Sequence, residues 1–520
     1  MKPVHTLKVW RVTLAILFFS PLLIFFTDFT GKLPERLHLL AHIQLIPAVL
    51  AGVYGIVAAL LTLTFLFGRI YCSVICPAGI LQDLMNRISR MGRKRKKKQR
   101  HFRYHKPQNV LRYLLLAVTT LPAAFGVTEL CLLLDPYSNF GRIAVHFFRP
   151  VVMEGNNLLA AGLSKTGNYA LYHISVNALT TGALTAAGIA LTVFAVMSFR
   201  RGRLFCNTLC PVGALLSVVS RHAIFRITVD KKTCTRCRAC EHACKAEAID
   251  PDEGKVDGSR CVGCFNCLSS CRKKALAYRP SFRRSAAPQL LGTEATGVGR
   301  RMFLGTGAAV VASLSTTTLK AWTGVGRRQR RKGQKNRLPI LPPGALNLTH
   351  FTDKCTACHL CVTKCPSHVL RPAGMEYGLD YLLKPHMAYI DSYCNFECVI
   401  CSQVCPTHAI RPLTVEAKKT AQIGIVRFYT DLCVVHTEEK DCGACSEHCP
   451  TQAVHMVPYK GTLTIPQVET ELCVGCGGCE SICPVRPGRA IIVEAHEIHQ
   501  IAEKPKEEKA LDVKVDEFGF

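Results

Sequence analysis

The sequence has few acidic residues: 36 aspartates and glutamates stand against 65 lysines and arginines, so the 520-residue chain has a formal net charge of +29. The basic residues concentrate in runs beside apolar segments, where membrane topology and anionic lipid account for them, so we expect no nucleic-acid partner. The apolar segments lack paired histidines at the spacing of haem ligands, so we expect no haem. No small-residue cleavage pattern follows the first apolar segment, which argues against a removed signal peptide.

Four segments are apolar and long enough to cross a bilayer, which takes roughly 20 helical residues. They are residues 9–29, 45–68, 110–134 and 179–199. Basic runs at 93–98 and 200–203 follow the second and fourth segments, and the positive-inside rule places both runs in the cytoplasm. We therefore expect an α-helical transmembrane block of four spans, residues 1–225, with a cytoplasmic amino terminus. The alternative is a set of buried helices in a large soluble protein.

An internal repeat lies within this block. Residues 68–79, Gly-Arg-Ile-Tyr-Cys-Ser-Val-Ile-Cys-Pro-Ala-Gly, return in similar form at 202–213. Each copy contains Cys-x3-Cys-Pro, formed by Cys72 and Cys76 and by Cys206 and Cys210, and each pair shares one face if the segment is helical. The four thiols are candidates for a metal site between the repeats, for thiol–disulfide chemistry, or for shaping the turn. The unpaired Cys131 is expected to be a buried apolar residue.

Cysteine is abundant, with 29 residues, but disulfide-rich scaffolds are short and lack long apolar segments. Residues 226–280 contain two runs with Cys-x2-Cys-x2-Cys-x3-Cys spacing, in which the fourth cysteine ligates the neighbouring 4Fe-4S cluster. Zinc is the competing interpretation, but zinc sites use two separated ligand pairs. The expected sets are Cys234, Cys237, Cys240 and Cys271, and Cys261, Cys264, Cys267 and Cys244.

Residues 338–500 carry four further cysteine groups, each ending in Cys-Pro, which predict four more clusters and six in all. Neighbouring groups could exchange the fourth ligand, or the first group could pair with the fourth and the second with the third. The groups are Cys355, Cys358, Cys361 and Cys365; Cys394, Cys398, Cys401 and Cys405; Cys433, Cys442, Cys445 and Cys449; and Cys473, Cys476, Cys479 and Cys483.

The expected architecture is therefore multi-domain: the helical block, a two-cluster bacterial ferredoxin-like α+β domain and a four-cluster ferredoxin-like α+β domain. Between the last two, residues 281–337 form a linker that contains Arg300-Arg301 before Phe303 and Leu304, typical of a twin-arginine export signal or of a fifth apolar segment. Residues 501–520 are expected to be a disordered tail.

The first 280 residues, with four apolar segments, paired Cys-x3-Cys-Pro motifs and two ferredoxin runs, resemble the NapH-type membrane quinol dehydrogenase subunit. Residues from about 300 onward, with the twin arginine and four cysteine groups, resemble the NapG-type subunit, so the chain looks like a fusion of the two. The resemblance implies a multi-pass protein of the bacterial inner membrane. It implies quinol from the membrane quinone pool as substrate, a periplasmic cytochrome c or terminal reductase as acceptor, and a periplasmic four-cluster domain.

Oxidation of a quinol also requires proton acceptors, and ionisable groups near bilayer depth are costly and therefore of functional interest. The candidates are Asp28, His38, His42, Glu129, Asp135 and His146, and no catalytic residue is assigned among them. The alternative function is a metal-handling or assembly factor similar to the CcoG-type cupric reductases, in which the four Cys-x3-Cys-Pro thiols receive copper.

Overall fold

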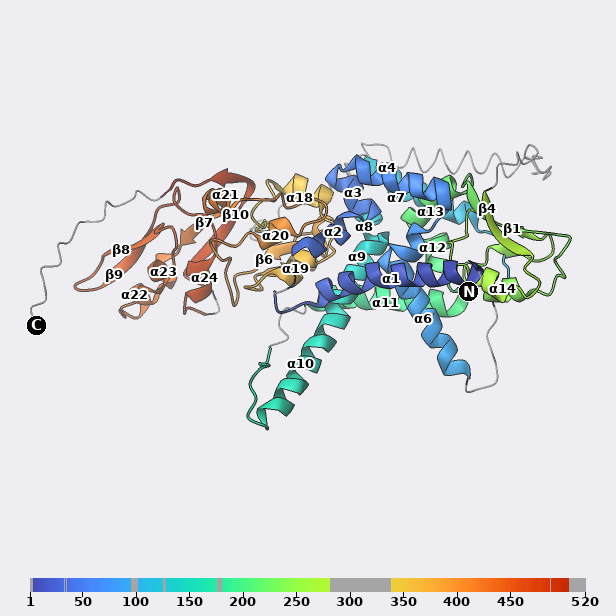
Figure 1. Ribbon diagram of the computed structural model, residues 1–520. Coiled ribbons are helices and arrows are strands. Elements are labelled where there is room, and N and C mark those ends of the chain that lie inside the picture. The colour runs from blue at the N-terminus through green and yellow to red at the C-terminus, as the bar shows by residue number, and fades with distance from the viewer. Residues whose placement is uncertain are drawn as a thin grey trace, which may run out of the picture.

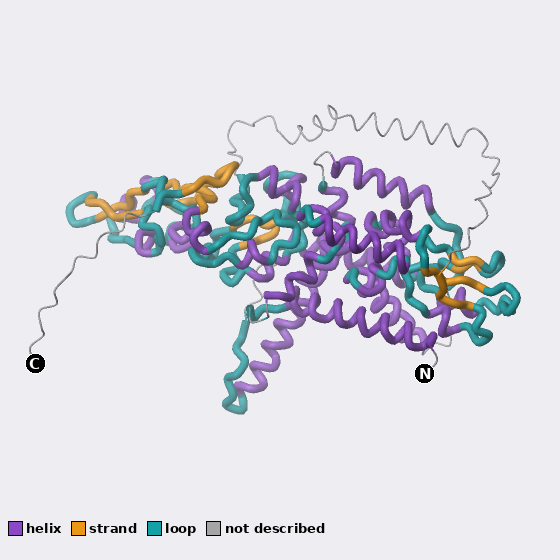
Figure 2. Tube along the Cα trace, turned by 45° about the horizontal axis from the view of Figure 1, so that its top comes forward, coloured by secondary structure: helices purple, strands orange, loops and turns teal. Residues whose placement is uncertain are grey.

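The structure is a computed structural model that describes residues 3–31, 33, 35–94, 102–124, 128–174, 180–280, 338–486 and 488–504. The expected linker at 281–337, with its twin arginine, lies outside the described residues, as do residues 95–98 of the basic run and the tail from residue 505. A block of helices occupies the middle of an elongated molecule, and a cysteine-containing module packs at each end (Figures 1 and 2).

The helical block contains the amino-terminal elements through α13. Its core includes Leu22 and Phe26 of α1 and Phe140 of α9, and it continues without interruption to Phe265 in one module and Cys358 in the other. The elements are α1 (Pro3–Thr27), η1 (Glu35–His38), α2 (Leu39–His42), α3 (Leu45–Ala51), α4 (Tyr54–Phe67), α5 (Tyr71–Val74), α6 (Pro77–Lys94), α7 (Asn109–Ala124), α8 (Glu129–Leu134), α9 (Pro136–Ile143), a π-helical turn η2 (Ala144–Phe148), α10 (Arg149–Ser164), α11 (Thr181–Arg201), α12 (Leu204–Thr208) and α13 (Pro211–Ser220).

Two of the expected spans are helices long and apolar enough to cross a membrane, within α1 and α11. Their outer faces expose large apolar side chains such as Leu17 on α1 and Ile189 on α11. The second segment is broken, because Gly52, with a φ of +77°, ends α3 before α4 begins. In the third segment the structure describes α7 and α8, and residues 125–127 lie outside the described residues. Hydropathy alone does not detect such breaks, because the residues on both sides are apolar. The arrangement of four spans therefore remains a prediction.

The first cysteine module follows α13 and has the pseudo-symmetric α+β form of a small ferredoxin. Strand β1 (Phe225–Val229) pairs antiparallel with the last strand, β4 (Leu276–Pro280), and β2 (Ile249–Asp250) pairs with β3 (Lys255–Val256). Two one-turn helices, α14 (Ala239–Ala243) and α15 (Asn266–Ser270), each begin directly after the middle of a cysteine run.

The second cysteine module is also α+β, with three antiparallel strand pairs, β5–β6, β7–β10 and β8–β9, in its described residues. The helices are short, and five of them, α19, α20, α22, α23 and α24, lie within the cysteine groups. The elements are α18 (Leu348–Lys354), α19 (Leu360–Lys364), β5 (Leu370–Pro372), η3 (Leu379–Tyr381), β6 (Pro385–Met387), α20 (Ile400–Gln403), α21 (Val415–Thr420), β7 (Ala421–Phe428), η4 (Thr430–Leu432), α22 (Val434–Thr437), α23 (Ala444–Glu447), β8 (Val454–Pro458), β9 (Thr464–Val468), α24 (Gly478–Ile482) and β10 (Ile491–Ile501).

Helix α1 contacts both modules. Near its start, Arg11 forms an ion pair of 2.6 Å with Asp83, which also pairs with Lys245 of the first module. Directly after its end, Asp28 forms an ion pair of 2.5 Å with Lys364 of the second module. At 1.5 Å per residue, these two contacts lie about 25 Å apart along the helix, so the thickness of the block separates the modules.

Candidate metal centres

The regular cysteine runs share one backbone conformation. In each of the four runs with Cys-x2-Cys-x2-Cys spacing, the residues on both sides of the middle cysteine have positive φ: Arg236 and Arg238, Gly263 and Phe265, Ala357 and His359, and Gly475 and Gly477. Left-handed residues turn the chain tightly, at a cost of about 1–2 kcal/mol for each residue with a side chain. The loop therefore turns tightly, and in two of the runs its three cysteines line one cavity.

A second turn follows the fourth cysteine. The third residue after it has positive φ in five of the six groups: Glu247, Lys274, His368, His408 and Gln452. Lys245 and Arg272 replace the usual proline in the first module, yet Glu247 and Lys274 adopt the same left-handed turn as the proline-containing groups. Proline is therefore not required for this geometry.

In the first module the structure brings together the ligand sets expected from ferredoxin spacing. Cys244, from the first run, lines a cavity with Cys261, Cys264 and Cys267 of the second run. In return, Cys271 lies close enough to Cys240 to affect its ionisation, together with Cys234. The two runs thus exchange their fourth cysteines.

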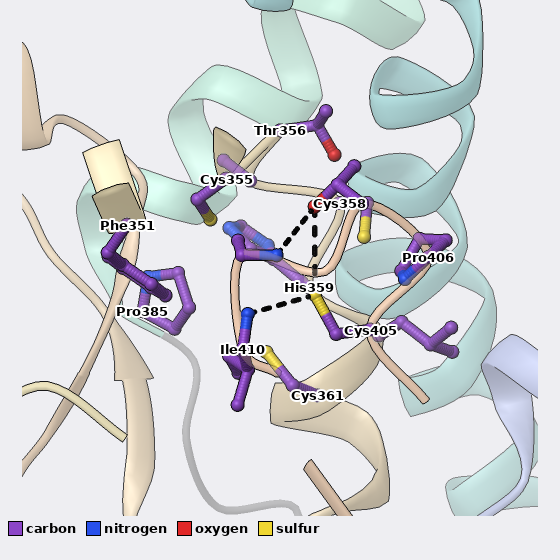
Figure 3. Close-up of a pocket in the computed structure, with 14 residues that line it drawn as sticks. Phe351, Cys355, Thr356, Cys358, His359, Cys361, Pro385, Cys405, Pro406 and Ile410 are labelled. Carbon is purple, nitrogen blue, oxygen red and sulfur yellow. Dashed lines mark hydrogen bonds between the residues drawn. The ribbon is translucent and has the colours of Figure 1, made fainter. Parts of the chain in front are cut away.

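In the second module the sequence left two pairings open, and the structure brings neighbouring groups together. Cys405 lines one cavity with Cys355, Cys358 and Cys361 (Figure 3). Cys483 lines another with Cys433, Cys442 and Cys445. The reciprocal sets are Cys365 with Cys394, Cys398 and Cys401, and Cys449 with Cys473, Cys476 and Cys479.

Burial makes the thiols of these sets costly to ionise. Burial raises the pKa of the Cys355 thiol to about 12 and that of the Cys358 thiol to about 11. Hydrogen bonds from backbone N–H groups lower both pKa values, but burial has the larger effect. Without a metal these thiols are protonated at neutral pH. Iron binding offsets the cost of ionising them.

In the described part of the chain, no three His, Cys, Asp or Glu side chains converge closely enough to share a single metal ion. A four-iron cube binds its thiolates at separate corners, so cysteines that hold a cluster need not converge on one point.

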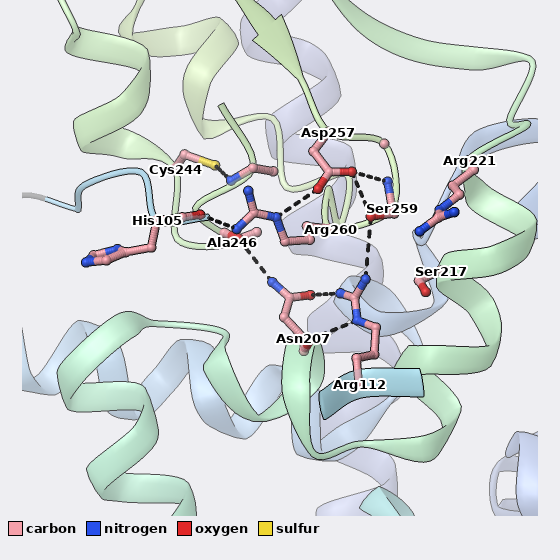
Figure 4. Close-up of polar contacts among 12 residues, drawn as sticks. His105, Arg112, Asn207, Ser217, Arg221, Cys244, Ala246, Asp257, Ser259 and Arg260 are labelled. Carbon is pink, nitrogen blue, oxygen red and sulfur yellow. Dashed lines mark hydrogen bonds and ion pairs between the residues drawn. The ribbon is translucent and has the colours of Figure 1, made fainter. Parts of the chain in front are cut away.

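The first module docks on the helical block through a network of polar contacts (Figure 4). Arg112 of α7 donates to the Asn207 carbonyl oxygen at 2.8 Å and to Ser259 Oγ at 3.4 Å, and Asn207 Nδ2 donates to the Ala246 carbonyl oxygen at 3.0 Å. Ser259 and Ala246 flank the cavity of Cys244 and Cys261. The cavity is thus held directly against the repeat of the block.

Asp83 of α6 makes a second contact to this module, because three cations share its carboxylate. Its carboxylate pairs with Arg203 at 2.6 Å, with Arg11 at 2.6 Å and with Lys245. Burial alone would raise the pKa of Asp83, but Arg203 and Lys245 outweigh burial and hold it well below its usual value. The hydropathy and cysteine patterns gave no reason to single out Asp83.

The candidate proton acceptors gather at the opposite end, against the second module. Asp28 pairs with Lys364, Glu129 with Lys384 at 3.5 Å, and His146 Nε2 lies 2.9 Å from His359 Nδ1. The ring of His42 lies between those of His38 and His408, with centroids 5.4 and 5.6 Å away. Asp135 caps α9 through Ser138 N at 2.9 Å.

The two Cys-x3-Cys-Pro motifs meet in the core of the block, at a place we call the seam. Cys72, Cys76, Cys206 and Cys210 are buried there, and the thiols of Cys76 and Cys210 are close enough to the other two for mutual effects on ionisation. Arg69 Nη2 donates to the Cys206 carbonyl oxygen at 2.9 Å, and Arg203 Nη1 donates to the Cys72 carbonyl oxygen at 2.5 Å. Each repeat thus holds the cysteine loop of the other. Both arginines stand directly after a glycine at matching positions of the repeat, Gly68-Arg69 and Gly202-Arg203, and this match is the sequence pattern that could have identified them.

The glycines of the repeat allow this close approach, and Gly79→Ala should therefore destabilise the seam. A Cβ at Gly79 would lie 2.2 Å from the Cys72 carbonyl oxygen, and one at Gly213 would lie 2.2 Å from that of Cys206. We expect Gly79→Ala to lower the free energy of unfolding by about 1–3 kcal/mol or more, seen as a lower thermal midpoint in detergent. Gly162→Ala in α10 is the control: its Cβ meets nothing within 4 Å, so stability should stay equal or rise. An unchanged midpoint for Gly79→Ala would contradict the crossed packing.

Comparisons with known families match the regions that contain these sites. Residues 49–98 and 183–231 match a model described as a 4Fe-4S binding domain, residues 440–486 match a 4Fe-4S dicluster domain, and residues 348–371 match a second 4Fe-4S binding domain. The chain therefore contains several iron–sulfur domains of the ferredoxin type.

Curated relatives cover parts of the chain. An uncharacterised protein of Methanocaldococcus jannaschii is 38% identical over 18% of this chain and 37% of its own length. The Escherichia coli protein YccM, whose name describes electron transport, is 26% identical over 44% of this chain and 55% of its own. The ferredoxin-type protein NapH of Escherichia coli is 24% identical over 39% of this chain and 59% of its own. The chain thus spans less than two thirds of each of these relatives, and no solved structure matches it. Over these parts the chain is similar to iron–sulfur proteins of the ferredoxin type.

Proposed function

We propose that the protein is a membrane-bound quinol dehydrogenase component that passes electrons from quinol through 4Fe-4S clusters to a periplasmic cytochrome or terminal reductase. The six cysteine sets would hold one cluster each, and a bound cluster supplies a site for one electron at a time. The helical block lies in the bacterial inner membrane through α1 and α11, with the first module in the cytoplasm and the second in the periplasm. The NapG-like character of the second module is part of this proposal.

The observation that carries the proposal is the gathering of ionisable groups at one end of the block. Asp28, His42, Glu129 and His146 come from four separate elements, yet all of them meet the second module. Tyr137 and Asp135 lie beside them, close enough to Cys358 to influence its thiol. Quinol oxidation needs a proton acceptor and an electron acceptor within short reach of one another. This interface supplies both.

Asp28 and Glu129 are engaged in ion pairs with lysines, so their first role is to hold the module. His42 is different, because its Nε2 is buried and has no hydrogen-bond partner among the described residues. Burial, followed by the neighbouring His38 and His408, lowers its pKa to about 4. The imidazole is therefore neutral at pH 7 and can accept a hydrogen bond from a quinol hydroxyl.

The direct test is reduction of the iron–sulfur chromophore by a quinol analogue in anoxic membranes that contain the protein. We expect the visible absorbance to bleach with quinol and to bleach fully with dithionite. Bleaching by dithionite alone would refute quinol oxidation. Copper reduction without bleaching by quinol would favour the metal-handling alternative. A reporter fused after Leu346 would be active in the periplasm if the proposed sidedness holds.

His42→Phe should slow the quinol-dependent reduction by roughly 100-fold, the usual range for loss of an acid–base group. Dithionite reduction and the iron content should stay unchanged, because no cysteine set is altered. His222→Phe is the matched control, since this exposed histidine lies at the end of the block next to the first module. Equal quinol rates for the two variants would remove His42 from the quinol site.

A further inference from the structure

The seam contains four buried thiols that none of the six cysteine sets uses. Cys72, Cys76, Cys206 and Cys210 are each at most 4% exposed. Two come from each repeat, and none of the four forms a disulfide. Cys210 Sγ accepts a hydrogen bond from Gly213 N at 3.2 Å, and Cys206 Sγ accepts one from Gln82 Nε2 at 3.2 Å. Such N–H donors stabilise thiolates in metal sites.

The positive charge at the seam is also unusual. Arg69 and Arg203 are at most 1% exposed, and each reaches across to the cysteine loop of the other repeat. Arg203 is paired with Asp83, but within the described residues Arg69 has neutral acceptors, namely Asn207 Oδ1 at 2.8 Å and the carbonyl oxygens of Cys206 and Ser259. A buried guanidinium without a carboxylate partner is costly unless a negative charge lies nearby. A group with four thiolate ligands would supply that charge.

The family match at residues 49–98 and 183–231 is described as a 4Fe-4S binding domain, yet each half contains two cysteines. Four thiolates are needed for one cluster, so neither half can hold a cluster alone. The structure completes the set by bringing the two halves together.

We propose that Cys72, Cys76, Cys206 and Cys210 hold one further iron–sulfur cluster, shared between the two repeats, and that this site connects the two modules electronically. The connection rests on the proposed function, whereas the site itself does not. At the cluster only the iron valence changes, because one electron enters and one leaves. Quinol is the reductant: each molecule gives up two electrons, and its two hydroxyl protons pass to acceptors at the second module as quinone forms.

The position of the seam supports the connection. On one side, Arg69 donates a hydrogen bond to the carbonyl oxygen of Ser259, two residues before Cys261 of the Cys244 set. On the other side, Cys76 and Cys210 belong to the same hydrophobic core as Cys358 of the second module. The seam thus lies in the core that joins the two modules.

The first experiment counts iron and acid-labile sulfide per chain after anoxic purification. Cys76→Ala combined with Cys210→Ala should remove about four irons, or two for a smaller cluster, with an equal loss of sulfide. Cys131→Ala is the matched control, because this thiol in α8 belongs to no set, and it should lose none. Unchanged iron in the double variant, or stoichiometric copper in the wild type that disappears from it, would overturn the site.

A second variant covers the possibility that the double variant does not fold. Gln82→Met removes the N–H donor to Cys206 Sγ while keeping a similar volume. We expect full iron content and one electron paramagnetic resonance signal with a more negative midpoint potential, because fewer donors stabilise the reduced form. Potentials that all stay unchanged would contradict the site.

The electronic connection is tested separately in the double variant. Quinol should still reduce the sets of the second module, whereas those of the first module should respond only to dithionite. Full reduction by quinol in the double variant would refute the connection. If quinol reduces nothing in the wild type, the proposed function fails while the iron count still decides the site.

Discussion

Cys355→Ala combined with Cys405→Ala should cost the protein about four irons, whereas Cys355→Ala combined with Cys365→Ala should cost about eight. The first pair belongs to one ligand set, because Cys405 lines the cavity of Cys355, Cys358 and Cys361. The second pair spans two sets, because Cys365 lies with Cys394, Cys398 and Cys401. Iron and labile sulfide per chain measure the difference directly.

The design separates the pairing from general damage to the module. Both double variants remove two cysteines from the same region, and both single variants, Cys405→Ala and Cys365→Ala, should lose about four irons each. If each run kept its own fourth cysteine, the two double variants would exchange their results. The corresponding test for the other half of the module uses Cys433 with Cys483 against Cys433 with Cys449.

Asp83→Asn should lower the free energy of unfolding by about 3–5 kcal/mol, because it leaves buried cations without their counter-ion. The Arg203 side chain is fully buried, and Lys245 and Arg11 are nearly so. The same carboxylate joins α1, the repeat and the first module, so the module should also become more susceptible to proteolysis. Thermal unfolding in detergent and limited proteolysis measure the two effects.

The control for this variant is Asp252→Asn, which breaks the exposed ion pair with Arg238. Pairs of that kind contribute little, so no measurable change in the thermal midpoint is expected. Equal thermal midpoints for Asp83→Asn and Asp252→Asn would show that the ion pairs of Asp83 do not stabilise the fold.

The same carboxylate predicts the direction of the acid response. In the unfolded chain an aspartate titrates at a pKa of about 4, and in the folded protein Arg203 and Lys245 hold the pKa of Asp83 well below that value. The stabilisation is therefore complete above about pH 4 and is lost as the pH falls toward the folded pKa. Asp83→Asn should flatten the dependence of stability on pH below about 4. If the variant and the wild type lose stability equally as the pH falls below about 4, the pKa of Asp83 is not lowered in the folded protein.

The cysteine spacing predicted a tight loop in each regular run, because a run of seven residues determines its own loop. The left-handed residues around Cys237, Cys264, Cys358 and Cys476 follow from that spacing. The exchange between Cys244 and Cys271 was also predicted, since only two runs were available. Four runs allow several pairings, and the choice among them depends on how distant strands and helices pack.

The sequence predicted less about where the helices break and which distant segments come into contact. Hydropathy found α1 and α11 but not the break at Gly52 in the second segment, because a glycine at an apolar helix end changes the chain direction without changing hydropathy. The proton-acceptor candidates were identified one by one, yet their partners Lys364, Lys384 and His359 lie more than 200 residues away in the chain. Contacts over such separations depend on tertiary packing, which periodicity does not describe.

The exchange of fourth cysteines determines when each cysteine set of the second module can be complete during synthesis on the ribosome. A nascent chain that has emerged only as far as Cys365 displays a full run of four cysteines but no finished site, because the set begun by Cys355 is closed by Cys405. The set begun by Cys433 likewise waits for Cys483. Under the proposed function, the first two sites of this module can both be complete only after Cys405 has emerged, and the last two only after Cys483. A chain truncated between Cys365 and Cys394 gains no site in this module.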